Sequence, residues 1–208
     1  MEPIIKTLTL RRFRSFSDAE VQFDNPTFLI GPNGSGKSNL VDSLSFLQEA
    51  MDTQVGPALM RRGGFETVKH RAGGTIAFDQ MGFGVALGKP HDEATAGRYA
   101  FVLRGSARGF VVDREQCVVD RQDGDRDWFE HSEDRFQSNV AGISPAVQSA
   151  ALTLPVIGGD RRFEPVLRAL SGIRKCAIEP SRLREWQGAN GAGLRADGAN
   201  AAAMLHTI

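Results

Sequence analysis

One segment near the N-terminus has the residue types and the spacing of a phosphate-binding loop. Its sequence, GPNGSGKS over residues 31–38, matches the pattern G-x-x-x-x-G-K-[ST] at every fixed position. Glycines let successive backbone N–H groups curl around an anion, and the N-terminus of a following helix adds partial positive charge. Lys37 is expected to reach the β- and γ-phosphates of a nucleoside triphosphate, and the Ser38 hydroxyl to bind Mg²⁺. The candidate nucleotide-binding residues are Gly31, Pro32, Asn33, Gly34, Ser35, Gly36, Lys37, Ser38 and Asn39.

The residues on either side of this loop predict the strand and the helix that would position it. TFLI, residues 27–30, is a fully apolar run that stops at Gly31, which predicts a buried central strand. From Ser38 a helix is expected, because apolar residues recur at helical spacing on one face. That face consists of Leu40, Leu44, Leu47 and Met51. A strand, a glycine-rich turn and a helix thus follow one another in the order that a phosphate-binding loop requires.

The first part of the chain, residues 1–55, is expected to contain two further strands before the loop. Apolar and polar residues alternate in IIKTLTLRRFRSF, residues 4–16, and again in EVQFDN, residues 20–25. This alternation is typical of a half-buried sheet. A turn around Ser17 and Asp18 is expected to separate the two strands.

The middle and last parts of the chain differ in pattern. Residues 74–135 contain four or five extended segments joined by polar turns, which predicts an antiparallel sheet with a hairpin turn at Asp123-Gly124. In residues 140–208, an amphipathic helix is expected over residues 160–170 and should end at Gly172. A short strand over residues 175–180 and the start of a helix around Asn200 are expected to follow.

Composition narrows the class of protein. Lys plus Arg and Asp plus Glu both number 25 among 208 residues, so the zero net charge gives no support to a non-specific nucleic-acid binder. The basic cluster RRFR, residues 11–14, is interpreted either as a solvated strand edge or as a DNA contact. Cys117 and Cys176 have no CxxC spacing, which fits a reduced protein and predicts no cysteine metal site. Without a signal-peptide pattern or an apolar run of about 20 residues, we expect a cytoplasmic protein.

The N-terminal segment also resembles a known group of ATPases. LTLRRFRSFSDAEVQFDNPTFLIGPNGSGKSNLVDSLSFL, residues 8–47, is similar to the opening of ABC-type AAA ATPases of the SMC, RecF-like and overcoming-lysogenization-defect (OLD) group. Members of this group begin with a strand, an N/R-F-R-S/C-F/H element, a second strand and a loop ending in G-K-S-N/S. Residues 13–16, FRSF, match that element, and Asn39 follows the loop serine. A looser resemblance covers Ile178 to Leu205.

The resemblance implies a fold, a cofactor and partners. The fold would be α/β, a P-loop NTPase lobe of the ABC-ATPase type, in which a mixed sheet carries the loop beside an adjoining antiparallel β-sheet and flanking helices. The cofactors would be ATP and Mg²⁺. The whole chain, residues 1–208, would then be the N-terminal part of one ATPase head. Its partners would be a C-terminal lobe that this sequence is expected to lack and a second head in a homodimer, with DNA as a further candidate.

The resemblance also implies roles for two residues outside the loop. Arg14 and Ser15 would lie near the base and the phosphates of the nucleotide. In the alternative interpretation, Phe13 and Phe16 are core anchors, and Arg14 is merely exposed between them.

The residues needed for hydrolysis are not identified by the sequence, and no catalytic residue is assigned. A Walker B strand would end in Asp-Glu, with the Glu polarising the attacking water. The nearest segments end at Asp113 and Asp120, and neither Asp is followed by Glu. Gln148, in preference to Gln116, is the candidate Mg²⁺-sensing glutamine. Ser171, in ALSGIRK, resembles an ABC signature but is expected to close a helix rather than open one.

Three functions follow as hypotheses. In the first, the chain is an ATP-binding, Mg²⁺-dependent ATPase lobe acting in DNA repair, chromosome maintenance or phage defence, whose hydrolysis needs the C-terminal lobe. In the second, it is a non-hydrolysing interaction module in which the nucleotide drives assembly, as the lack of a Walker B motif favours. A P-loop kinase or small GTPase is less supported, because no N-K-x-D motif for base recognition occurs. In each of the first two hypotheses, this chain alone is expected to hydrolyse ATP slowly or not at all.

Overall fold

The computed structural model describes residues 3–177 apart from 71–78, 90–94, 122, 133–134 and 147, together with residues 181, 195–197 and 200. The chain divides into two units, Met1–Gly172 and Ile173–Ile208. In the second unit, the backbone N–H of Ala177 donates to the carbonyl of Ala196 at 2.6 Å. The strand predicted over residues 175–180, the helix around Asn200 and the second resembling segment fall wholly or partly outside the described residues.

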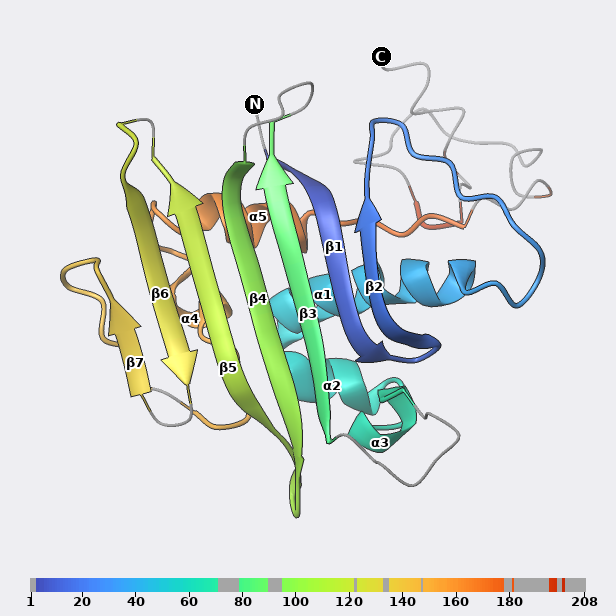
Figure 1. The fold of residues 1–208 in the computed structure, drawn as a ribbon, viewed down its shortest axis with the longest axis horizontal. Coiled ribbons are helices and arrows are strands. Elements are labelled where there is room, and N and C mark those ends of the chain that lie inside the picture. The colour runs from blue at the N-terminus through green and yellow to red at the C-terminus, as the bar shows by residue number, and fades with distance from the viewer. Residues whose placement is uncertain are drawn as a thin grey trace. The chain divides into compact units, whose positions relative to one another are not determined.

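The first unit is built on one antiparallel sheet, drawn in Figure 1. Among the described residues its seven strands are β1 (Ile4–Phe13), β2 (Phe16–Gln22), β3 (Gln80–Gly88), β4 (Thr95–Ser106), β5 (Gly109–Asp120), β6 (Arg126–Ser132) and β7 (Arg135–Ser138), in the order β2-β1-β3-β4-β5-β6-β7. The predicted α/β class, with an antiparallel sheet and flanking helices, is confirmed. The described strands nevertheless form one sheet rather than two, because β1 pairs with β2 along one edge and with β3 along the other.

The helices of the first unit are α1 (Lys37–Thr53), α2 (Val55–Met60), α3 (Phe65–Val68), α4 (Leu154–Ile157) and α5 (Glu164–Ser171). Figure 1 shows α1, α2, α4 and α5 on one face of the sheet. The prediction of a helix ending at Gly172 is confirmed for α5, where the N–H of Gly172 donates to the carbonyl of Arg168 at 2.8 Å. No helix in the described part of the chain has the length and apolar character needed to span a lipid bilayer.

A cluster of phenylalanine rings joins α1 to the sheet. The ring centroid of Phe83 on β3 lies 5.1 Å from that of Phe13, 5.0 Å from that of Phe46 and 5.2 Å from that of Phe101. Because α1 also contacts α2 and α5, its buried face is wider than predicted. It consists of Leu40, Ser43, Phe46, Leu47, Ala50 and Met51, while Leu44 is only half-buried.

The turn between β1 and β2 lies three residues earlier than predicted. Phe13 pairs with Phe16, so the turn consists of Arg14 and Ser15, whereas Ser17 and Asp18 belong to β2. Such a tight connection needs a residue with positive φ, and Arg14 has φ 49°. The hairpin predicted at Asp123-Gly124 is confirmed between β5 and β6, where Gly124 has φ 90°.

The prediction of a buried strand immediately before the loop is wrong for the described chain. Residues 27–30 form no strand, and the side chains of Phe28, Leu29 and Ile30 are 80%, 43% and 95% exposed. A strand requires a neighbour with which to exchange backbone hydrogen bonds. Both edges of β1 are occupied, β2 is the edge strand beside it, and residues 27–30 pair with no described strand.

Candidate functional site

The predicted phosphate-binding loop, residues 31–38, has the backbone geometry that its glycines were expected to provide. Gly34 and Gly36 have φ of 80° and 95°, values that favour glycine, and Gly36 is the N-cap of α1. The carbonyl of Gly36 accepts the N–H of Leu40 at 2.9 Å. A Cβ at Gly31 would lie 3.1 Å from Ser35 Oγ, which is closer than ordinary packing. The loop therefore leads directly into the helix, whose first N–H groups have no acceptor within the helix and can meet an anion.

The ammonium group of Lys37 lies within the curve of the loop. Its Nζ donates to the carbonyls of Gly31 and Pro32, both at 2.7 Å, and to Ser35 Oγ at 3.3 Å. An ammonium group has three donors, so these bonds use its full capacity. To bond a phosphate, Lys37 must exchange at least one of them. Since these contacts are exposed to solvent, their net contribution to folding is small and the exchange is easy.

The start of α1 presents the other predicted residues. Ser38 is exposed in the first turn, where its hydroxyl is available to a cation. The amide nitrogen Nδ2 of Asn39 donates to Ser15 Oγ at 2.8 Å. The roles of Ser38 toward Mg²⁺ and of residues 31–39 toward a nucleotide stay predictions.

The structure brings the turn between β1 and β2 against the loop. A Cβ on Gly36 would lie 3.4 Å from both Ser15 Oγ and Phe16 Cζ. Arg14, the neighbour of Ser15, is 30% exposed at its side chain, and its Nε donates to Asp42 Oδ2 at 2.6 Å. Ser15 thus lies against the loop, while the Arg14 side chain lies on Asp42 of α1, and the contact of either residue with a nucleotide stays a prediction.

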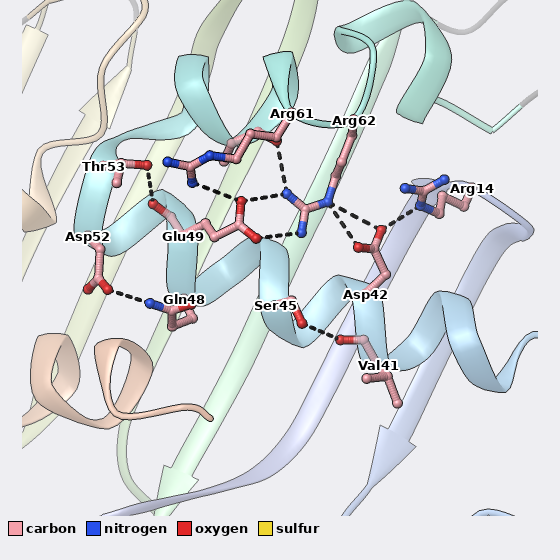
Figure 2. Close-up of polar contacts among 11 residues, drawn as sticks. Arg14, Val41, Asp42, Ser45, Gln48, Glu49, Asp52, Thr53, Arg61 and Arg62 are labelled. Atoms are coloured by element: carbon pink, nitrogen blue, oxygen red, sulfur yellow. Dashed lines mark hydrogen bonds and ion pairs between the residues drawn. The ribbon is translucent and has the colours of Figure 1, made fainter. Parts of the chain in front are cut away.

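Four charged residues that form ion pairs along α1 were not identified from the sequence. Figure 2 shows Asp42 and Glu49 on α1 joined to Arg61 and Arg62, which follow α2. The signal available was the spacing of Asn39, Asp42 and Glu49, which lie on one side of a helix at intervals of three and seven residues. Nothing in the sequence showed that the RR pair would face them.

The two arginines keep Glu49 ionised. The hydrogen bond from Arg62 lowers the pKa of the Glu49 carboxyl against the opposing effect of burial, and Arg61 lowers it further. Burial lowers the pKa of Arg62, but Glu49 and Asp42 together raise it above its ordinary value. Glu49 and Arg62 are therefore both charged around neutral pH.

The acidic residues considered for a Walker B motif form ion pairs on the sheet. Asp113 Oδ1 accepts from Arg104 Nε at 2.8 Å, and Asp120 Oδ1 accepts from Arg126 Nε at 2.9 Å. Both lie on β5, which is separated from β1 by β3 and β4. These ion pairs between neighbouring strands explain the presence of both aspartates without a catalytic role.

Gln148 lies in an exposed turn, in which its carbonyl accepts the N–H of Ala151 at 3.1 Å. Within the described residues, no hydrogen bond joins Gln148 to Ser38, and its role as a magnesium ligand stays a prediction. The same part of the chain contains no group of three or more His, Cys, Asp and Glu residues able to hold a metal ion.

Residues 4–86, which include β1, β2, the loop and α1 to α3, match the family model of the AAA ATPase domain. The predicted resemblance to AAA ATPases of the SMC and RecF-like group is confirmed by similarity to curated proteins. The chain is 40% identical over 73 residues to the DNA replication and repair protein RecF of Magnetococcus marinus, which covers 35% of this chain and 19% of that protein. It is 47% identical over 47 residues to the chromosome partition protein Smc of Rhodopirellula baltica, which covers 21% of this chain and 4% of that protein.

The similarity is local. Each of these matches spans less than a fifth of the relative's own length. A solved structure from work on ATP-driven dimerization and DNA-stimulated activation of SMC ATPases aligns with 81% of this chain and 97% of that chain, at 18% identity and a TM-score of 0.30. The part of the chain that resembles an AAA ATPase domain is thus residues 4–86, which contain the loop.

Proposed function

We propose that this chain is an ATP-binding, Mg²⁺-dependent lobe of an SMC/RecF/OLD-like ATPase. The observation that carries the proposal is the complete loop at the N-terminus of α1, with Lys37 inside its curve and Ser38 exposed beside it. Loop amides and the helix N-terminus attract the phosphates, while a lysine and a hydroxyl supply the contacts that MgATP requires. The task of such a protein would be DNA repair, chromosome maintenance or phage defence, in keeping with the relatives' names.

Hydrolysis in this proposal needs a second, C-terminal lobe. Its proposed contact is the segment before the loop, where Phe28 and Ile30 are 80% and 95% exposed. Consecutive exposed apolar residues of this kind mark a surface that another chain segment covers. A strand from the second lobe would give residues 27–30 the neighbour that the described sheet does not supply. Pairing of two complete heads around ATP would then form the homodimer.

The alternative function is a non-hydrolysing module that uses the nucleotide only to drive assembly. The observation that favours it is that Asp113 and Asp120, the nearest Walker B candidates, are held by Arg104 and Arg126. Neither aspartate lies on a strand next to the loop.

Calorimetric titration of the chain with ATP, with and without Mg²⁺, tests the proposal. We expect Ser38→Ala to remove most of the gain in affinity that Mg²⁺ gives, because the hydroxyl ligand is lost. Ser45→Ala is a matched control on the same helix, since the Ser45 hydroxyl bonds only the carbonyl of Val41, at 3.1 Å (Figure 2). Absence of ATP binding to the unaltered chain would contradict the proposed function.

Turnover tests whether this chain hydrolyses ATP without a second lobe. We expect the 208-residue chain to bind ATP but to release phosphate no faster than the background reaction, because neither a Walker B glutamate nor an ABC signature is identified in the sequence. Phosphate release is measured at saturating MgATP, with Lys37→Ala as the control. Turnover well above that control would show that this chain hydrolyses ATP without a second lobe. It would also contradict the non-hydrolysing alternative.

A further inference from the structure

A chain of ion pairs along one side of α1 begins next to the phosphate-binding loop (Figure 2). Asp42 lies three residues after Asn39 and therefore shares a helix face with it. The Asp42 carboxylate accepts a hydrogen bond from Arg14 Nε at 2.6 Å and another from Arg62 Nε at 3.1 Å. Asp42 thus connects the turn between β1 and β2 with the segment that follows α2.

Two residues of α1 bond the two side chains of the turn between β1 and β2. Asn39 donates to Ser15 at 2.8 Å, and Asp42 accepts from Arg14 at 2.6 Å. Both helix residues lie within the first two turns of α1, the helix whose N-terminus carries the loop. The position of Arg14 relative to the loop is therefore set by the same helix that would bind the phosphates.

The backbone of Arg14 is also fixed. Its φ of 49° is uncommon for a residue with a side chain and persists only where the surroundings impose it. The Arg14 N–H donates to the carbonyl of Val68 at 2.8 Å. The Arg14 carbonyl lies 2.6 Å from Nδ1 of His70, which must carry the proton because a carbonyl can only accept.

Arg14 and Arg62 differ in how many donors remain free. Arg62 is 7% exposed, and its guanidinium donates to Asp42, to both oxygens of Glu49 and to the carbonyl of Ala58. Arg14 uses Nε on Asp42, and among the described residues its Nη1 and Nη2 have no hydrogen-bond acceptor. Arg14 can therefore bond an anion without leaving Asp42, whereas Arg62 cannot.

We propose that Asp42 is a positioning residue of the nucleotide site, which holds Arg14 by Nε so that its two Nη groups meet the phosphates. This inference rests on the proposed function of ATP binding. Asp42 touches no nucleotide atom in this arrangement and acts only through Arg14.

A double-mutant cycle on the full chain tests this role, with MgATP affinity measured by calorimetry. Arg14→Ala and Asp42→Asn are each expected to weaken binding about tenfold, as the loss of one charge-assisted hydrogen bond does. The double variant should bind no more weakly than Arg14→Ala, because Asp42 has no effect without Arg14. Glu49→Gln is the control. It removes the carboxylate that holds Arg61 and Arg62 but not Arg14, so the melting temperature should fall while the affinity stays within about twofold.

Several results would overturn the proposal. Asp42→Asn binding MgATP as well as the unaltered chain, or more tightly, would show that the carboxylate only repels the phosphates. If the affinity losses of the two single variants multiply in the double variant, Asp42 acts independently of Arg14 and has a general structural role. An Arg14→Ala variant with unaltered MgATP affinity would exclude the positioning role of Asp42, even if Asp42→Asn fails to fold. If Lys37→Ala also binds normally, ATP binding at the loop itself is wrong; if Lys37→Ala loses binding while Asp42→Asn does not, only the role of Asp42 is wrong.

Discussion

Replacement of Lys37 by alanine is expected to abolish measurable MgATP binding. The Lys37 ammonium lies inside the loop, 2.7 Å from the carbonyls of Gly31 and Pro32. Hydrogen bonds to charged groups contribute about 1.5–3 kcal/mol each, so losing the two bonds that Lys37 is expected to make to the β- and γ-phosphates lowers the affinity by roughly 10² to 10⁴. Removal of the ammonium also leaves the negative charge of the phosphates without its nearest cation.

The measurement is calorimetry of MgATP with the unaltered chain and with Lys37→Ala, after circular dichroism has shown that the variant is folded. The fold should be kept, since the Lys37 side chain contacts only exposed loop atoms. Lys89→Ala is the matched control, because Lys89 is an exposed lysine that follows β3 and its replacement changes the net charge equally. Unchanged affinity in Lys37→Ala would contradict nucleotide binding by this loop.

The features that the sequence predicted correctly depend on short stretches of chain. The loop motif, the start of α1, the end of α5 at Gly172 and the turn at Gly124 are each determined by residues within a few positions. Glycine supplies positive φ at Gly34, Gly36 and Gly124 whatever surrounds it. These elements could therefore be located without knowledge of the rest of the fold.

The features that were missed depend on partners distant in sequence. An apolar run such as residues 27–30 shows a tendency to be buried, but only a neighbouring strand can bury it, and β1 pairs instead with β3 more than 60 residues later. The position of the turn at Arg14 depends on the pairing of Phe13 with Phe16 and on the contacts of Val68 and His70. The ion pair of Asp42 with Arg62 likewise exists only once α2 has turned the chain back along α1.

A fully buried carboxylate connects the sheet to α4 and predicts a large effect on stability. Glu115 on β5 is 0% exposed. Its Oε1 accepts the hydroxyl of Tyr99 at 2.8 Å and the backbone N–H of Leu154 at 2.9 Å, and its Oε2 accepts the N–H of Thr153. Thr153 Oγ1 in turn lies 2.9 Å from Nδ1 of the buried His131. The carboxylate therefore satisfies the first N–H groups of α4 inside the core, where water would otherwise have to reach them.

Glu115→Ala is expected to lower the free energy of unfolding by about 4 kcal/mol, because it leaves two backbone N–H groups and one hydroxyl without an acceptor in the core. Tyr99→Phe, which removes only one donor to the same carboxylate, should lower it by about 1 kcal/mol. Urea denaturation followed by circular dichroism measures both. A Glu115→Ala variant no less stable than Tyr99→Phe would mean that the N-terminus of α4 is satisfied by water. Glu115 would then be dispensable for attaching α4 to the sheet.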